Sequence, residues 1–241
     1  MRPPSSLKKI GERVVSLRVP IVKAFIFAIT WFFLPGWLFA ILALVLYFIP
    51  FSQSGSVAWP FFGLLFLCVM QPAGFLFALV FGGIFLYILL SKELVVIDRK
   101  GAYEIMTFIL AFLFLRSFYL DVGGYFGDGA MFYALLLAIY LGFLISSFLA
   151  MYSGNRKESR QSALAIGWLS FLLVWQFIIV GLFLPLDFVY QSVIVFSVIV
   201  FLVDLIPRYA FGDDSRNRLL TTATVVFSLL VLVLGSARWG L

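Results

Sequence analysis

Long apolar segments, almost free of charged residues, recur along the chain from residue 25 to its end. A helix needs about 20 mostly apolar residues to cross the hydrocarbon core of a bilayer. Seven segments meet this requirement, and short polar connections separate them. They are residues 25–49, 61–90, 103–122, 130–152, 163–184, 188–206 and 219–236. The pattern predicts an all-α, polytopic integral membrane protein, a bundle of seven transmembrane helices that form one domain, 24–241.

The overall composition supports lipid as the solvent for most of the surface. Hydrophobic residues make up 64% of the 241 residues and charged residues only 12%. A soluble domain has about 45–50% apolar and about 25% charged residues. A chain of this length buries a large core in water only if enough polar surface covers it, and 12% charge is too little for that.

Lysine and arginine lie almost entirely on one side of the predicted bundle, if each segment crosses once. The opposite connections carry no basic residue, and only Arg116 and Arg238 break the pattern. The basic side contains Arg2, Lys8, Lys9, Arg13, Arg18 and Lys23 at the N-terminus, Lys92, Arg99 and Lys100 in the second connection, Arg156, Lys157 and Arg160 in the fourth, and Arg208, Arg216 and Arg218 in the sixth. Cytoplasmic loops are enriched in these residues. We therefore expect a cytoplasmic N-terminus and an external C-terminus, in the plasma membrane of a prokaryotic cell.

Residues 59–90 are too long for one upright span, because about 30 helical residues extend roughly 45 Å and the hydrocarbon core is about 30 Å thick. Splitting this segment into two spans at "MQPAG" would move every later basic connection to the other side. We therefore expect one crossing that is kinked at Pro72 or preceded by an interfacial helix, and the sequence leaves both arrangements open.

The first 23 residues form a separate basic segment. Leu7, Ile10, Val14, Leu17 and Ile21 recur at spacings of three and four residues, which places them on one face of a helix. This predicts an amphipathic helix on the anionic cytoplasmic leaflet, bound through Lys8, Lys9 and Arg13 and ended by Pro20. The alternative is a helix that docks on a partner protein.

Several kinds of chemistry are excluded by the residues that the chain lacks. There is no histidine, so catalysis by a histidine base and metal ligation by histidine are excluded. Cys68 is the only cysteine, so no internal disulfide forms. Every lysine lies in or beside a predicted connection, which argues against a retinal-type Schiff base. We expect no cofactor and no metal, and the scattered basic residues give no patch for nucleic acid.

Arg116 is the most distinctive residue, because charged residues at membrane depth usually face protein or a cavity. It follows Glu104 by 12 residues, or about 18 Å of helix, and therefore lies in the outer half of the membrane. Asp121 does not share its helix face, but Asp128 and Asp187 belong to external turns that approach it if the hairpins are neighbours. Arg116 then either snorkels or pairs with an acid, or it forms an outward-facing site for an anionic ligand or a lipid headgroup with these three aspartates.

Four other polar residues are candidates inside the membrane: Gln71, Gln176, Gln191 and Asp204. The amides suit hydrogen bonds between helices or to a carbonyl freed by proline, and alternatively they line a polar path. Asp204 precedes Arg208 by four residues, which predicts a local ion pair. Glycines 82, 83 and 167, with Ser170, predict close helix contacts.

No pair of carboxylates converges in these segments, so we do not expect an enzyme. The short loops and few buried charges favour a non-catalytic scaffold, assembly factor or subunit of a membrane complex, with another membrane protein or a second copy as partner. The alternative is a small transporter or channel with an outward-facing anion or headgroup site at Arg116.

Overall fold

The computed structural model describes residues 5–49, 58–72, 74–93, 99–122, 129–153, 157–211 and 216–237. Side chains are described for 17–49, 58–72, 74–92, 101–122, 129–148, 165–205 and 220–237. All regular structure in these residues is helical. The helices are α1 (Ser5–Phe33), α2 (Gly36–Phe48), α3 (Ala58–Met70), α4 (Phe75–Glu93), α5 (Arg99–Val122), α6 (Gly129–Ser153), α7 (Lys157–Phe183), α8 (Phe188–Phe211) and α9 (Arg216–Ser236). The all-α prediction is confirmed for the part of the chain that is described.

Five of these helices are long and apolar enough to cross a membrane. The qualifying stretches are Phe75–Lys92, Gly101–Val122, Gly129–Phe148, Ala165–Phe183 and Phe188–Leu205, in α4 to α8. Gly36–Phe48, Ala58–Met70 and Leu220–Ser236 are apolar but shorter. The prediction of several helices that are long and apolar enough to span a membrane is confirmed.

The helices group into two compact units, residues 1–106 and 107–241, and the boundary falls within α5. The predicted division into 1–23 and 24–241 separates a basic N-terminal segment from the transmembrane domain, whereas these two units are groups of packed helices. The predicted division stays a prediction. Unit 1 contains α1 to α4, and unit 2 contains most of α5 together with α6 to α9.

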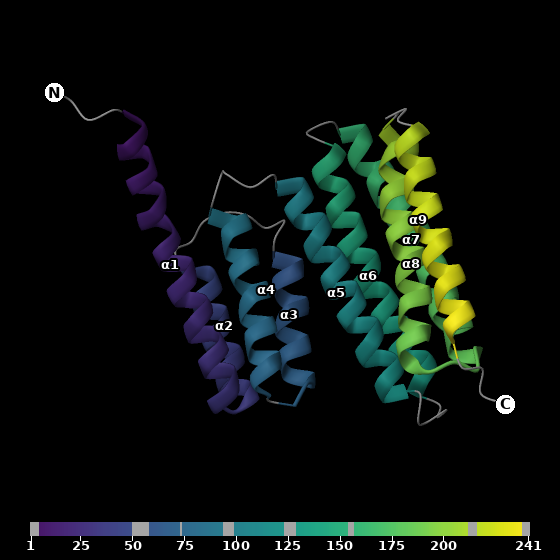
Figure 1. Ribbon diagram of the computed structural model, residues 1–241, viewed down its shortest axis with the longest axis horizontal. Coiled ribbons are helices and arrows are strands. Elements are labelled where there is room, and N and C mark those ends of the chain that lie inside the picture. The colour runs from purple at the N-terminus through teal and green to yellow at the C-terminus, as the bar shows by residue number, and fades with distance from the viewer. Residues whose placement is uncertain are drawn as a thin grey trace. The chain divides into compact units, whose positions relative to one another are not determined.

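The segment 25–49, predicted as a single span, is not one helix. After α1 ends at Phe33 the chain reverses and returns as α2, which packs against α1 (Figure 1). Pro35 lacks the N–H that would continue α1, and its extended ψ of 144° turns the chain before Gly36. The residues of this turn are apolar, so the sequence lacks the polar residues that usually indicate a turn between two helices.

The break predicted at Pro72 is confirmed, but it also reverses the chain. Helix α3 ends at Met70, and α4 starts at Phe75 and runs back beside it (Figure 1). Neither a kinked span nor an interfacial lead-in was the correct description of 59–90. Each of the two helix pairs, α1–α2 and α3–α4, returns the chain to the end of unit 1 from which it came (Figure 1).

Helix α1 continues through Pro20, where the sequence predicted its end. Proline within a helix removes one backbone hydrogen bond, and neighbouring helices compensate for this in membrane proteins. The side chain of Pro20 is buried, and α4 packs along α1. The side chains of Lys8, Lys9 and Arg13 are outside the described residues, so leaflet binding and the amphipathic face stay predictions.

Stacked aromatic rings form the core of unit 1. Phe27 stacks on Phe85 with ring centroids 4.2 Å apart, and Tyr47 stacks on Phe61 at 4.1 Å. Phe61 and Phe85 approach to 6.0 Å and join the two stacks. Because these rings come from α1, α2, α3 and α4, one continuous aromatic cluster holds all four helices together.

Candidate functional site

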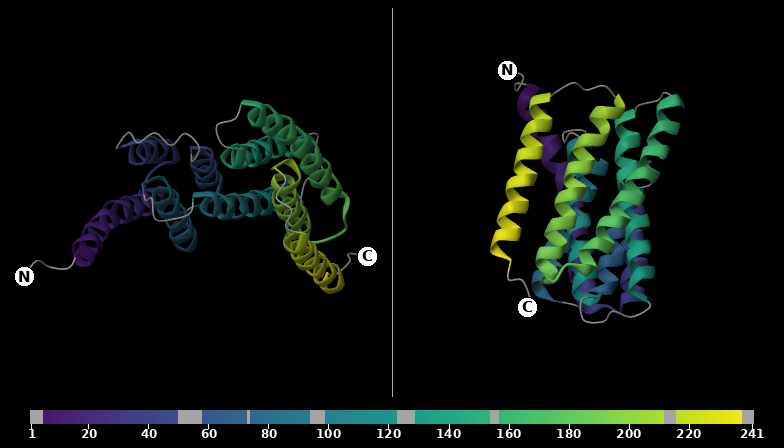
Figure 2. Two further views of the ribbon diagram at one scale, coloured as in Figure 1. Left: turned by 90° about the horizontal axis from the view of Figure 1, so that it is seen from above. Right: turned by 90° about the vertical axis from the view of Figure 1, so that its right-hand side faces the viewer.

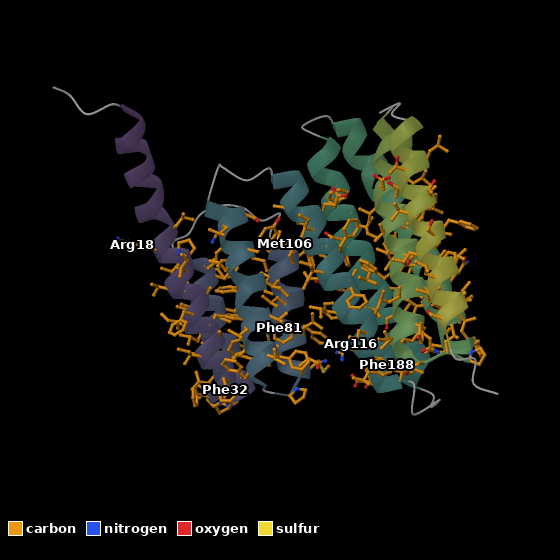
Figure 3. All side chains as sticks on the ribbon, viewed as in Figure 1. Arg18, Phe32, Phe81, Met106, Arg116 and Phe188 are labelled. Atoms are coloured by element: carbon orange, nitrogen blue, oxygen red, sulfur yellow. The ribbon has the colours of Figure 1, made fainter. Side chains whose placement is uncertain are left out.

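Arg116 faces the start of α8. Its Cζ lies 6.0 Å from the ring centroid of Phe188, which is within the range of a cation–π interaction (Figure 3). One and two turns earlier on α5, Phe112 and Phe108 contact the ring of Phe196 on α8. The half-buried Arg116 therefore ends a stripe of α5 side chains that lies along α8.

Of the three predicted acidic partners of Arg116, only Asp121 and Asp187 are among the described residues, and neither forms an ion pair with it. Asp121 and Asp187 are exposed. The Oδ1 atom of Asp187 accepts a hydrogen bond of 2.8 Å from the backbone N–H of Phe188, and this residue provides the ring that Arg116 contacts. Asp128 lies outside the described residues. No ion pair of Arg116 with an acid occurs in the described part of the chain, so the four-residue site stays a prediction.

Gln191 has a structural role that the sequence partly anticipated. Its buried Nε2 donates a hydrogen bond of 2.9 Å to the carbonyl of Leu184, directly before Pro185. Its backbone N–H donates to the carbonyl of Asp187. Gln191 therefore holds the turn between α7 and α8 by satisfying a carbonyl beside a proline.

Two of the other three predicted polar positions, Gln71 and Asp204, are half-buried. Gln71 is half-buried just after α3, and its backbone N–H donates to the carbonyl of Leu67. Asp204 is half-buried in α8, about two turns before this helix ends at Phe211. The side chain of Arg208 is outside the described residues, so the predicted ion pair between them is not described.

Gln176 differs from these residues because its side chain points away from the core. It lies in the middle of the apolar stretch Ala165–Phe183 of α7 and is exposed. No hydrogen-bond partner for its amide is found among the described residues. The buried residues of α7, which include Val174 and Ile178, lie on the opposite side of the helix. An amide therefore stands at the centre of the outward, apolar face of α7.

Close contacts with α6 fix the rotation of α7. A Cβ atom at Gly167 would lie 2.7 Å from Cβ of Ser146, and one at Gly142 would lie 2.8 Å from Cβ of Phe171. The prediction that Gly167 permits a close helix contact is confirmed. Of the predicted pair 82 and 83, Gly82 approaches Ala28, whereas Gly83 has open space around it.

Tyr119 of α5 provides a third constraint on α7. Its hydroxyl donates a hydrogen bond of 2.9 Å to the carbonyl of Ile178. The same hydroxyl occupies the space that a side chain at Gly181 would need, and Cγ2 of Val195 would lie 3.1 Å from that Cβ. Because α6 and α5 pack against the core side of α7, the side chain of Gln176 points outward.

A second polar feature, in unit 1, was missed by the sequence analysis. Lys92 was assigned to a connection, but it lies in the last turn of α4 and its side chain is only 6% exposed. Its Nζ donates to the carbonyl of Tyr47 at 2.6 Å and lies 4.5 Å from the Tyr47 ring centroid. Lys23 of α1 donates to the carbonyl of Ile49. Two cations therefore complement the negative end of α2.

The described residues contain no group of three or more side chains that would hold a metal ion. Helix α9 stands at the edge of unit 2 beside α8 (Figure 2), and among its described side chains none from 220 to 236 is buried.

No protein-family model, no curated protein and no solved structure matches the chain.

Proposed function

We propose that this protein is a non-catalytic component of a membrane complex and that it works by binding another protein within the bilayer. The observation that carries this proposal is the exposed amide of Gln176 at the centre of the outward face of α7. The same face carries large apolar side chains, among them Leu169, Leu172 and Phe183.

The cost of leaving this amide in lipid supports a protein partner. Hydrocarbon offers no hydrogen bond, so an amide that faces it loses its bonds to water without replacement. Transmembrane helices use glutamine to hydrogen-bond across their interfaces. A partner that covers the outward face of α7 satisfies Gln176 and buries its apolar neighbours together.

Photo-crosslinking in native membranes tests this proposal. A benzophenone amino acid at Leu172 is expected to give a discrete protein adduct, and adding Gln176→Leu is expected to reduce it severalfold. The same probe at Leu79, an exposed leucine of α4 in unit 1, serves as the control. Adducts with lipid alone at Leu172, indistinguishable from those at Leu79, contradict the proposal.

A second candidate function is the transport or binding of an anion at Arg116. It is favoured by the half-buried guanidinium against Phe188, with no acid paired to it among the described residues. Native mass spectrometry of protein purified in its own lipids tests this candidate. Bound anionic lipid or small anion should be lost in Arg116→Gln and kept in Arg18→Gln, a change at an exposed arginine of α1. Equal loss in both variants contradicts a specific site.

We also propose that the protein resides in the plasma membrane of a prokaryotic cell, with its N-terminus in the cytoplasm and its C-terminus outside. The distribution of lysine and arginine supports this orientation. It holds whether the pairs α1–α2 and α3–α4 cross the membrane or dip into it, because each pair contributes an even number of passages. The basic residues of segment 1–23, at the start of α1, then lie at the anionic cytoplasmic leaflet.

A further inference from the structure

We propose that the outward face of α7 binds α7 of a second copy of this chain, with the two Gln176 amides hydrogen-bonded to each other. This inference rests on the proposed function, because it identifies the partner that covers Gln176. The two helices run parallel around a twofold axis along the membrane normal, since both copies insert with the same orientation.

The spacing of the exposed residues suits such a pair. Leu169, Gln176 and Phe183 are spaced seven residues apart, and Ala165 and Leu172 precede them by four. Apolar residues that repeat every seven positions at these offsets form the seam of a left-handed helix pair. All five side chains are exposed and lie within about 60° of one another around the helix. The seam extends over about 27 Å, which matches the hydrocarbon core.

The surrounding helices leave this seam open and hold it in place. Gly167 and Gly181 seat α7 on Ser146 and Tyr119, and both glycines lie on the core side of the helix. A rotation of α7 that turned Gln176 inward would drive larger side chains into these contacts. The amide therefore has to be satisfied from outside unit 2.

A second copy satisfies it through the chemistry of the amide itself. The glutamine side chain carries both a donor NH₂ and an acceptor oxygen, so two glutamines pair with each other reciprocally. In a shared bilayer, two identical chains place this residue at the same depth, and no adjustment of register is needed. A single polar residue within an apolar seam also fixes the register and number of the associated helices. Identical copies thus meet the requirement without any other molecule.

Disulfide crosslinking in native membranes tests the pairing. In a Cys68→Ala background, Leu169→Cys should form a disulfide-linked dimer on mild oxidation, with twice the 27.2 kDa mass of the chain. Phe177→Cys is the matched control, because it is an exposed residue of α7 about 100° from Gln176 around the helix. Adding Gln176→Leu should weaken dimerisation about three- to thirty-fold, as expected for the loss of hydrogen bonds between transmembrane helices, and Gln176→Asn should retain part of it.

The outcomes separate this inference from the proposed function. A benzophenone adduct at Leu172 with a different protein, together with no dimer from Leu169→Cys, overturns the second copy as partner and leaves the proposed function intact. Two results would overturn both the second copy as partner and the proposed function. One is the absence of any protein adduct and of any dimer, and the other is an adduct within one chain. A dimer that forms equally from Phe177→Cys, or that Gln176→Leu does not weaken, overturns the seam. An unchanged thermal unfolding midpoint of the Gln176→Leu monomer excludes misfolding as the cause of a lost dimer.

Discussion

The hydroxyl of Tyr119 fills the space beside Gly181 and donates its hydrogen bond to the carbonyl of Ile178, one turn earlier on the same helix. One ring thereby joins α5 to α7 through both shape and hydrogen bonding. The same contact sets the rotation of α7, and with it the direction in which Gln176 points. The stability of this contact and the exposure of Gln176 are therefore linked.

Gly181→Ala should lower the free energy of unfolding by about 1–3 kcal/mol, the usual cost of adding a carbon to a filled core. The added Cβ would meet the Tyr119 hydroxyl and lie 2.9 Å from its Cζ. Thermal unfolding in a fixed detergent measures the loss. Gly83→Ala is the control, because nothing lies within 4 Å of its Cβ position. Tyr119→Phe should offset part of the Gly181→Ala loss, and strictly additive losses contradict the contact.

Gly167→Ala should also destabilise the protein by about 1–3 kcal/mol, because its Cβ would lie 2.7 Å from Cβ of Ser146. Exchanging the two small residues tests the contact directly. In the double variant Gly167→Ala, Ser146→Gly, one Cβ again lies between the helices, so most of the stability should return. A double variant that unfolds at or below the temperature of Gly167→Ala argues against this contact.

Lys92→Met should destabilise unit 1 by about 1–3 kcal/mol. The substitution keeps much of the apolar stem but removes the charged donor from the buried carbonyl of Tyr47, and hydrogen bonds to charged groups contribute about this much. The shift of the thermal unfolding midpoint reports the effect. Arg18→Met removes a charge from an exposed position of α1 and should change stability by less than about 0.5 kcal/mol. Equal shifts for both variants would show that Lys92 acts only through net charge.

The proposed orientation predicts which introduced cysteines react in intact cells. In a Cys68→Ala background, Asp187→Cys in the exposed turn between α7 and α8 should react with a membrane-impermeant maleimide added outside. Arg18→Cys should react only after the cells are permeabilised. The reverse pattern would place the basic ends of the helices outside the cell.

The helices of unit 2 could be predicted from the sequence because each of their apolar runs is close to one membrane thickness. The runs 130–152 and 188–206 begin and end near polar or glycine-rich connections, and α6 and α8 follow them. The reversal at Leu34 and Pro35 could not be predicted in this way, because "WFFLPGWLF" contains no polar residue. Proline alone was no sufficient signal, since Pro20 lies inside α1 while Pro35 and Pro72 stand at turns.

The direction of Gln176 could not be predicted either. Helix α7 is apolar on all sides, so the hydrophobic pattern does not indicate which face is buried. That information comes from the contacts of Gly167 and Gly181 with their neighbours, which join residues far apart in the sequence. Lys92 was misplaced for a similar reason, because the carbonyl to which it donates, that of Tyr47, belongs to α2, 45 residues earlier.

The central claim is that Gln176 holds two proteins together in the membrane, and energy transfer between labelled copies tests it most directly. Purified protein labelled with donor or acceptor at Asp187→Cys, in the Cys68→Ala background, is mixed in lipid vesicles and diluted with lipid. As lipid is added, energy transfer in the unsubstituted Gln176 protein should stay above the level of random encounter. In the Gln176→Leu protein, energy transfer should fall to that level at a protein-to-lipid ratio about three- to thirty-fold higher than in the unsubstituted protein. Identical dilution curves for the two proteins would contradict the account.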